Sequence, residues 1–137
     1  MSFAGAYAGR RVLVTGHTGF KGAWLSEWLA SLGARVTGMA LAPPTEPALF
    51  DQLGLGRRLD HVAGDIRDGA AVQRVVDACR PEFIFHLAAQ PLVRKSYAEP
   101  AETYAVNVMG TVNVLEAVRL ADRPCVVVCV TTDKCYE

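Results

Sequence analysis

The sequence predicts an α/β fold in which a doubly wound parallel sheet, with strand order 3-2-1-4-5, forms the middle of three αβα layers. Short β-branched apolar runs alternate with longer amphipathic segments, which is typical of this fold class. The runs near residues 11–15 and 125–130 are apolar almost throughout, as in strands buried on both faces. A glycine-rich turn joins the first run to a helix, and right-handed crossovers around that strand give the order.

Composition and charge place the chain among ordinary globular domains. Its 137 residues, 51% hydrophobic and 20% charged, are enough for one domain with its own core. Lysine plus arginine number 14 and aspartate plus glutamate also number 14, so charge does not favour nucleic acid or an anionic membrane as a partner. We find no internal repeat or linker, and we expect a single domain over residues 1–137.

Targeting signals and cysteines indicate the compartment. No segment approaches the ~20 consecutive apolar residues of a membrane-spanning helix, and the first residues lack the layout of a signal peptide. Cys125 and Cys129 are separated by about 13 Å if they lie on one strand, too far for a disulfide. No C-x-x-C pair is present for zinc. We therefore expect buried, reduced thiols, no metal site and a cytoplasmic protein.

The first third of the chain is expected to form two strands around one helix. Arg11–Thr15 is the first strand, and an amphipathic helix begins at Ala23. Helical spacing places five large apolar side chains on its buried face: Trp24, Leu25, Trp28, Leu29 and Leu32. Gly33 ends this helix, and residues 35–41 form the second strand. The proline-rich residues 42–47 are either a loop at the ligand site or a rigid connector.

Two further strands and a capped helix follow. Residues 59–63 are the third strand, and Asp68 is expected to cap a helix that ends at Cys79. That helix buries its apolar face: Val72, Val75, Val76 and Cys79. Residues 82–87 are the fourth strand. Residues 91–100 have no periodicity and are expected to line the cleft.

Residues 103–120 form the clearest helix. Its expected buried face is Tyr104, Val108, Thr111, Val112, Leu115 and Val118. Asn107 lies beside that face and needs a hydrogen-bond partner; a structural bond to backbone is favoured over contact with a ligand. Residues 125–130 are the fifth strand.

The turn between the first strand and the first helix has the composition of a phosphate-binding loop. Gly16 allows a sharp turn, Gly19 allows backbone N–H groups to approach a diphosphate, and Gly22 allows the helix to pack close to the sheet. The helix N-terminus presents unpaired N–H donors and a partial positive charge. The spacing G-x-x-G-x-x-G with a strand before and a helix after favours dinucleotide binding over a purely structural turn.

Polar or small residues follow three other strands at the same sheet edge. Asp65 can accept a hydrogen bond from an adenine amino group or act only in the turn. The small residues in the segment Leu87, Ala88, Ala89 and Gln90 leave room for a flat cofactor. Residues 131–134 combine hydroxyl, carboxylate and amine, which is typical of an active site, with an ordinary polar loop as the alternative. Residues 36–41, where an acidic partner for the adenosine ribose is expected, contain no acidic residue, and Arg35 is the one evident partner for a 2′-phosphate, so charge does not distinguish NAD from NADP.

Four motifs together resemble the CDP-glucose 4,6-dehydratases, a branch of the extended short-chain dehydrogenase/reductases with a Rossmann-type sheet. They are Gly16-His17-Thr18-Gly19-Phe20-Lys21-Gly22, residues 42–47, residues 86–94, and Thr132-Asp133-Lys134-Cys135-Tyr136. The proline loop and the lysine at 134 are specific to that branch, since the related dTDP-glucose enzymes carry a glutamate at the lysine position. The similarity covers nearly the whole chain.

The resemblance implies a dehydration without net redox change. CDP-D-glucose is oxidised at C4, loses water across C5 and C6, and regains the hydride at C6 to give CDP-4-keto-6-deoxy-D-glucose, with NAD as the hydride carrier. Thr132 would hydrogen-bond the C4 oxygen, and Asp133 would protonate the departing oxygen, which requires a buried, protonated carboxyl. Lys134 would be the C5 base if neutral, or an electrostatic or acidic partner if charged.

The resemblance also assigns the cofactor contacts. The diphosphate would lie on the glycine-rich turn, adenine beside Asp65 and Ile66, and the nicotinamide end between the 87–90 segment and Thr131. The residues expected to hold the cofactor around the turn are Gly16, His17, Thr18, Gly19, Phe20, Lys21 and Gly22.

One family motif has no counterpart here. The Tyr-x-x-x-Lys pair of these enzymes is absent, because Tyr97 is followed four residues later by Ala101 and Tyr104 by Val108. The resemblance therefore implies that the chain is an N-terminal portion, truncated before the substrate-binding region, of an enzyme that is homo-oligomeric when complete. We expect weak NAD binding and no dehydration by these residues alone, with strand five as an uncovered apolar edge. The alternatives are a non-catalytic dinucleotide-binding module or a fragment of a related sugar-nucleotide epimerase.

Overall fold

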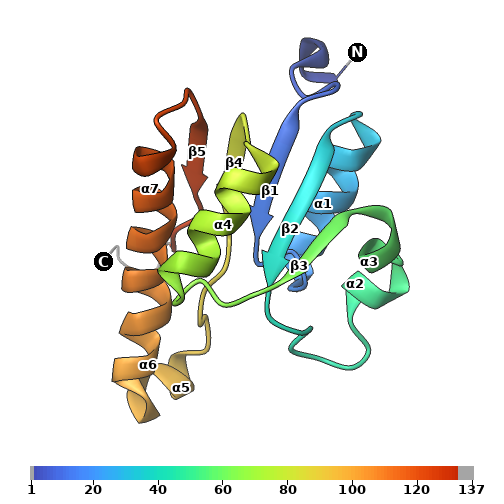
Figure 1. Ribbon diagram of the computed structural model, residues 1–137. Coiled ribbons are helices and arrows are strands. Elements are labelled where there is room, and N and C mark those ends of the chain that lie inside the picture. The colour runs from blue at the N-terminus through green and yellow to red at the C-terminus, as the bar shows by residue number, and fades with distance from the viewer. Residues whose placement is uncertain (1, 133–137) are drawn as a thin grey trace.

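Five parallel strands form one sheet in the order β3-β2-β1-β4-β5 (Figure 1). The computed structural model describes residues 2–132. The strands are β1 (Arg11–Thr15), β2 (Arg35–Ala40), β3 (Asp60–Ala63), β4 (Phe83–His86) and β5 (Val126–Cys129). Val14 of β1 pairs with Gly38 of β2 and with Phe85 of β4. The predicted strand order is therefore confirmed, and each predicted strand lies within a residue or two of its place.

Helices cover both faces of the sheet, as the three-layer prediction requires. In Figure 1, α4 (Gly69–Cys79) and α7 (Gly110–Ala121) lie on one face, and α1 (Phe20–Ser31) lies on the other. β1 alternates between the layers: Val12 and Val14 pack in the cluster that contains Leu29 of α1, whereas Leu13 packs with residues of α4 and α7. Full burial of such side chains stabilises the fold by about 1.5–3 kcal/mol each.

Helix α1 differs from its prediction in both start and buried face. It begins at Phe20 rather than Ala23, and its buried residues are the small ones, Gly22, Ala23 and Ser26, together with Leu29. The side chains of Trp24 and Trp28 are 54% and 52% exposed. Because α1 packs so closely against the turn that precedes it, its inner face has no room for indole rings.

Short helices occupy segments that the sequence assigned to no helix or strand, apart from Thr103 and Tyr104 of the last one. They are η1 (Ser2–Gly5), α2 (Leu49–Gln52), α3 (Leu55–Arg58), α5 (Val93–Ala98) and α6 (Pro100–Tyr104). α5 and α6 lie beyond the carboxyl ends of the strands (Figure 1). The expectation that residues 91–100 form an aperiodic cleft lining is wrong for their conformation, because most of them are helical, and neither helix buries a residue.

The predicted buried face of the helix over residues 103–120 is also wrong. A π-helical stretch (Ala105–Met109) leads into α7, whose buried residues are Gly110, Val114 and Ala117. A Cβ atom at position 110 would lie 2.5 Å from Ile66 Cδ1, so close packing selects small residues here. The larger apolar residues that were expected inside are at least 46% exposed: Tyr104, Val108, Val112 and Leu115.

Strand β5 forms one edge of the sheet and is largely exposed. Val126, Val128 and Val130 are 43–54% exposed, so the expectation of burial on both faces is wrong, whereas the uncovered apolar edge is observed. Cys129 is exposed, contrary to the expectation of buried thiols, and Cys79 and Cys125 are half-buried. Cys79, Cys125 and Cys129 are free thiols, and burial raises the pKa of Cys79 to about 11. Within residues 2–132, no helix combines the length and apolarity needed to cross a membrane.

Asp68 caps α4 as predicted, since its Oδ1 accepts a hydrogen bond from the Ala71 N–H at 3.0 Å. We expect Asp68→Ala to lower the free energy of unfolding by about 1 kcal/mol, because the helix loses a partner for an N-terminal donor. Urea denaturation measures this change. Asp77→Ala, at an exposed position on the same helix, is the matched control and should shift stability by no more than about 0.5 kcal/mol. Equal effects of the two substitutions would contradict the capping role.

Candidate functional site

Two of the three glycines in the turn after β1 are required by packing. Gly16 has φ +78°, and a Cβ atom there would lie 2.7 Å from the Ala88 backbone nitrogen beyond β4. A Cβ atom at Gly22 would overlap the carbonyl oxygen of Gly16. The backbone of the turn is therefore pressed between the end of β4 and the first turn of α1, and neither position accommodates a side chain.

Gly19, the remaining glycine of the turn, is not required by packing. Its backbone angles, φ −75° and ψ 167°, are open to any residue, and a Cβ atom there would meet only the Gly16 oxygen, at 3.4 Å. Within the described part of the chain, neither strain nor crowding explains a glycine at this position. The missing side chain leaves space directly above the N-terminus of α1, where backbone N–H groups point outward.

The N-terminus of α1 lacks the partners that the N-terminus of α4 has. In the described chain, no side chain caps α1, its first turn contains no acidic residue, and its N-cap is Gly19 itself. By contrast, the Asp68 carboxylate caps α4. A 12-residue helix that leaves its first N–H groups without a side-chain acceptor offers donors and a partial positive charge to an anion.

His17 and Thr18 of the same turn are directed into the protein. The His17 ring is fully buried, Nε2 lies 2.8 Å from His61 Nδ1, and the ring packs edge-on against Phe50. Burial and the neighbouring His61 lower the pKa of His17 to about 4. Thr18 Oγ1 donates to the Leu41 carbonyl at 2.9 Å. A ligand would therefore meet the backbone of these two residues and the exposed side chains of Phe20 and Lys21.

The segment after β4 lies against the glycine turn and is held by side chains from outside it. Thr15 Oγ1 accepts hydrogen bonds from the Leu87 and Ala88 N–H groups, at 3.1 and 3.2 Å. Asn107 holds Gln90 on both sides, accepting from its N–H at 2.7 Å and donating to its carbonyl at 3.1 Å. The structural role expected for Asn107 is confirmed. Ala89 is exposed between these two anchors.

Asp65 and Ile66 follow β3 at the same sheet edge. Ile66 is buried in the core beneath α7, whereas Asp65 is half-buried and bound by Arg67, whose Nε lies 2.9 Å from Asp65 Oδ2. This hydrogen bond lowers the pKa of Asp65, so the carboxylate stays ionised. Arg67 also donates to Glu102 of α6, which ties the β3 edge to the helices beyond the sheet.

The candidate catalytic residues are only partly visible. Thr131 and Thr132 are exposed and follow β5, whose end is fixed by the Val130 N–H donating to the His86 carbonyl at 3.0 Å. They therefore lie at the carboxyl ends of the strands, as the glycine turn does, two strands away from it. Asp133 and Lys134 lie outside the described residues. The structure thus places the turn, Asp65, the 87–90 segment and Thr131–132 along one edge.

Sequence patterns assigned no supporting role to three polar residues whose hydrogen bonds hold the carboxyl ends of the strands in place. These residues are Thr15, His86 and Thr111, which lie in segments predicted as strand or helix. In such segments the prediction depends on the pattern of apolar residues. Thr15 and His86 are 0% and 4% exposed. A buried polar side chain at a strand end was the available clue, because such groups must find hydrogen-bond partners.

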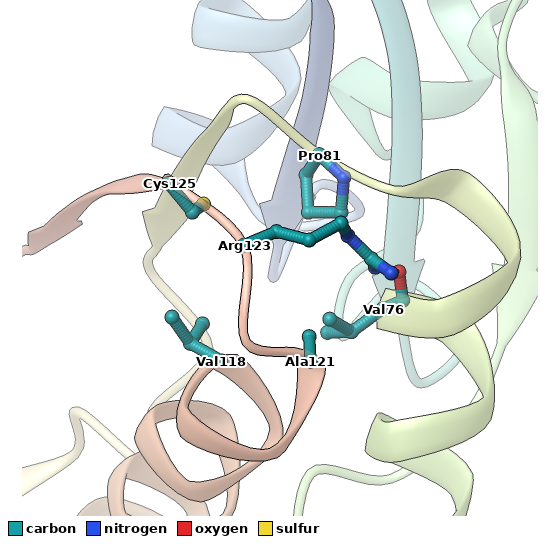
Figure 2. Close-up of a pocket in the computed structure, with 6 residues that line it drawn as sticks. All are labelled: Val76, Pro81, Val118, Ala121, Arg123 and Cys125. Atoms are coloured by element: carbon teal, nitrogen blue, oxygen red, sulfur yellow. The ribbon is translucent and has the colours of Figure 1, made fainter.

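Two cavities of the described residues have no lining residue in the glycine turn. One cavity, of about 10 Å³, has room for at most one water molecule. Figure 2 shows the residues that line it, near the ends of α4 and α7 that lie at the amino ends of the strands. Arg123 crosses it and donates to the Val76 carbonyl at 3.4 Å. A larger hollow of about 480 Å³ is lined by residues of β2, β3 and α4 and reaches Gly64 at the end of β3, and no residue of the glycine turn lines it. Among the described residues, no three His, Cys, Asp or Glu side chains are grouped to hold a metal.

A parallel sheet of this order, with a glycine turn where the strand order reverses, defines the class of Rossmann-type nucleotide-binding proteins. Comparison with known sequences is more specific. Residues 13–136 match the family model described as GDP-mannose 4,6 dehydratase, and the chain belongs to this family. It is 51% identical to CDP-glucose 4,6-dehydratase of Salmonella typhimurium over 131 residues, which cover 96% of this chain and 36% of that protein. The predicted resemblance is thereby confirmed.

Other relatives share the fold and less of the sequence. CDP-paratose 2-epimerase of Salmonella typhi is 30% identical, over 92% of this chain and 38% of that protein. UDP-glucose 4-epimerase of Thermotoga maritima, solved with UDP-glucose, superposes with a TM-score of 0.75 at 29% identity, over 88% of this chain and 37% of that one. UDP-glucose 4-epimerase of Thermus thermophilus, solved with NAD, superposes with a TM-score of 0.71 at 33% identity, over 80% of this chain and 34% of that one. The chain thus spans about a third of the length of these relatives.

Proposed function

We propose that residues 1–137 form the NAD-binding domain of a CDP-glucose 4,6-dehydratase, which converts CDP-D-glucose to CDP-4-keto-6-deoxy-D-glucose. The observation that carries the cofactor part is Gly19, whose missing side chain keeps open a space that the fold itself does not need. The dehydratase part is supported by the 51% identity to such an enzyme, against 30% for the paratose epimerase.

The residues around the turn fit a dinucleotide. The diphosphate would accept hydrogen bonds from the backbone N–H groups at the start of α1, which no side chain of the described residues caps. Adenine would lie at the β3 end, where Arg67 holds the Asp65 carboxylate ionised as an acceptor for an amino group. When bound, NAD supplies the hydride acceptor and donor of the reaction.

The other end of the cofactor would lie against the backbone from Leu87 to Gln90 and beside Thr131. The small side chains of Ala88 and Ala89 admit a flat ring to the backbone there. In the proposed reaction Thr132 hydrogen-bonds the C4 oxygen, Asp133 protonates the departing C6 oxygen, and Lys134 acts near C5. Residues of the complete enzyme outside 1–137 would complete the CDP-glucose site. The complete enzyme would be a homo-oligomer.

Gly19→Ala tests the cofactor site with little disturbance of the fold. We expect the free energy of unfolding to change by no more than about 1 kcal/mol, because the added methyl group has room and an allowed backbone. The same methyl group would stand between a diphosphate and the α1 N–H donors, so NAD affinity should fall at least about tenfold. Isothermal calorimetry with NAD and urea denaturation measure the two effects separately.

Gly9→Ala is the control for a glycine substitution away from the site. Gly9 has φ +71° and precedes β1 at the opposite sheet edge, so alanine there adds backbone strain without approaching the turn. We expect Gly9→Ala to lower stability and leave NAD affinity unchanged. Wild-type protein that binds no NAD, or a Gly19→Ala variant with unchanged affinity, would refute the proposed site.

A further inference from the structure

His86 joins three elements of the sheet edge through one buried imidazole. Nδ1 lies 2.6 Å from Thr15 Oγ1 at the end of β1, and Nε2 lies 2.9 Å from Thr111 Oγ1 in α7. The His86 carbonyl accepts the hydrogen bond that fixes the end of β5. The histidine thus lies where the glycine turn, the 87–90 segment and Thr131–132 are attached to the sheet.

The hydrogen bonds around this imidazole allow only one arrangement of protons. Thr111 Oγ1 donates its single proton to the Asn107 carbonyl at 2.7 Å, so it must accept a proton from His86 Nε2. Thr15 Oγ1 already accepts the Leu87 and Ala88 N–H groups, so its own proton goes to His86 Nδ1. The network is complete when His86 is neutral and carries its proton on Nε2. Burial lowers the pKa of His86, which also favours the neutral imidazole.

The network ends on backbone that the proposed cofactor site uses. From His86 it passes through Thr15 to the Ala88 N–H, and through Thr111 to the carbonyl of Asn107, whose side chain holds Gln90. Asn107 and Thr111 span the junction of the π-helical stretch with α7, a helix irregularity that is frequent at functional sites. Both ends of the 88–90 backbone are therefore held by this network, whereas Ala89 between them stays exposed.

We propose that His86 is a positioning residue: its neutral imidazole, held between Thr15 and Thr111, sets the 88–90 backbone in register with the glycine turn for the nicotinamide end of a dinucleotide. This inference rests on the proposed function. It assigns no contact between His86 and the cofactor. It concerns the half of the dinucleotide that lies beyond the diphosphate, and it leaves the adenine half unaffected.

The test compares Thr111→Val with Thr111→Ser. Valine keeps the shape of threonine and removes the hydroxyl that accepts from Nε2, whereas serine keeps the hydroxyl. With the full chain, we expect Thr111→Val to weaken NAD binding about tenfold, as for the loss of a buried polar partner, and to leave ADP binding within about twofold. ADP carries the adenine half and the diphosphate without the nicotinamide. Thr111→Ser should bind both ligands like the wild type.

A merely structural role predicts a different result, in which Thr111→Val weakens the binding of NAD and of ADP equally or weakens the binding of neither. Either result, or a serine variant that behaves like valine, overturns the inference. Nitrogen-15 NMR of the wild-type imidazoles is an independent measurement that needs no variant: a proton on Nδ1 of His86 also overturns it.

Failure of the proposed function gives a distinct signature, in which the wild type binds neither NAD nor ADP. The amide resonances of Ala88, Ala89 and Gln90 then decide the positioning role, since they should move in Thr111→Val and stay in place in Thr111→Ser. Unmoved resonances in Thr111→Val would overturn the inference.

Discussion

Gly22→Ala is expected to lower the free energy of unfolding by about 3 kcal/mol or more. The new methyl group would overlap the Gly16 carbonyl oxygen and lie 2.7 Å from the Gly16 carbonyl carbon and 2.9 Å from His17 Cα. All three are backbone atoms of a turn already pressed against β4, so no side-chain rotation relieves the contact. Alanine is a better helix former than glycine by about 1 kcal/mol, and this gain is smaller than the cost of the overlap.

Urea denaturation of Gly22→Ala beside Gly19→Ala measures this prediction. The two positions lie three residues apart at the start of α1, and only at position 22 would a Cβ atom overlap the backbone of the turn. We expect a large loss of stability for the first variant and a change of no more than about 1 kcal/mol for the second. If Gly22→Ala is as stable as the wild type, α1 does not pack on the turn as described.

Acidification from pH 7 to pH 5 is expected to destabilise the protein by about 2 kcal/mol through His17 alone. The pKa of His17 is lowered from 6.5 to about 4 in the folded state, by burial first and by His61 second. The unfolded chain therefore binds a proton between these values while the folded chain does not. Stability is retained above pH 6.5, falls as the pH drops below it, and levels off below about pH 4.

His17→Phe isolates this contribution, because it keeps a ring beside Phe50 and removes the titrating group. Between pH 7 and pH 5, the wild type should lose about 2 kcal/mol more of its free energy of unfolding than this variant loses. Carboxylates with lowered pKa, such as Asp65, lose their contribution at lower pH and do not obscure this window. Equal pH dependence of the two proteins would show that His17 titrates normally.

For the candidate site, the sequence indicated the glycine turn and the polar residues along one edge of the sheet. A parallel sheet brings all its carboxyl ends to the same edge, so motifs after separate strands can be placed together without coordinates. The sequence assigned the three glycines different roles, but it could not identify the atoms that exclude a side chain at residues 16 and 22. A Cβ atom at residue 22 would meet residue 16 within the same turn, and one at residue 16 would meet residue 88, which lies far away in the chain.

The buried faces of α1 and α7 were the least predictable features, whereas α4 buries Val72, Val75 and Val76 as predicted. The helical segment that runs from the end of α6 through α7 carries two apolar stripes. Periodicity favoured the stripe with larger side chains, Tyr104, Val108, Val112 and Leu115. Packing selects the other stripe, because Gly110 leaves room for the Ile66 side chain, and Val114 and Ala117 pack in the core cluster with the valines of α4. The tryptophans of α1 are exposed for the same reason, since only small residues fit against the turn.

Local pattern was therefore sufficient for the α/β class, the strand order, the Asp68 cap and the place of the glycine turn. These features depend on alternation, turn chemistry and handedness, which neighbouring residues specify. The buried faces of α1 and α7, the inward ring of His17 and the network of Thr15, His86 and Thr111 required the folded chain. They depend on which surfaces meet and how closely, and on hydrogen-bond partners up to 73 residues apart, which no local periodicity encodes.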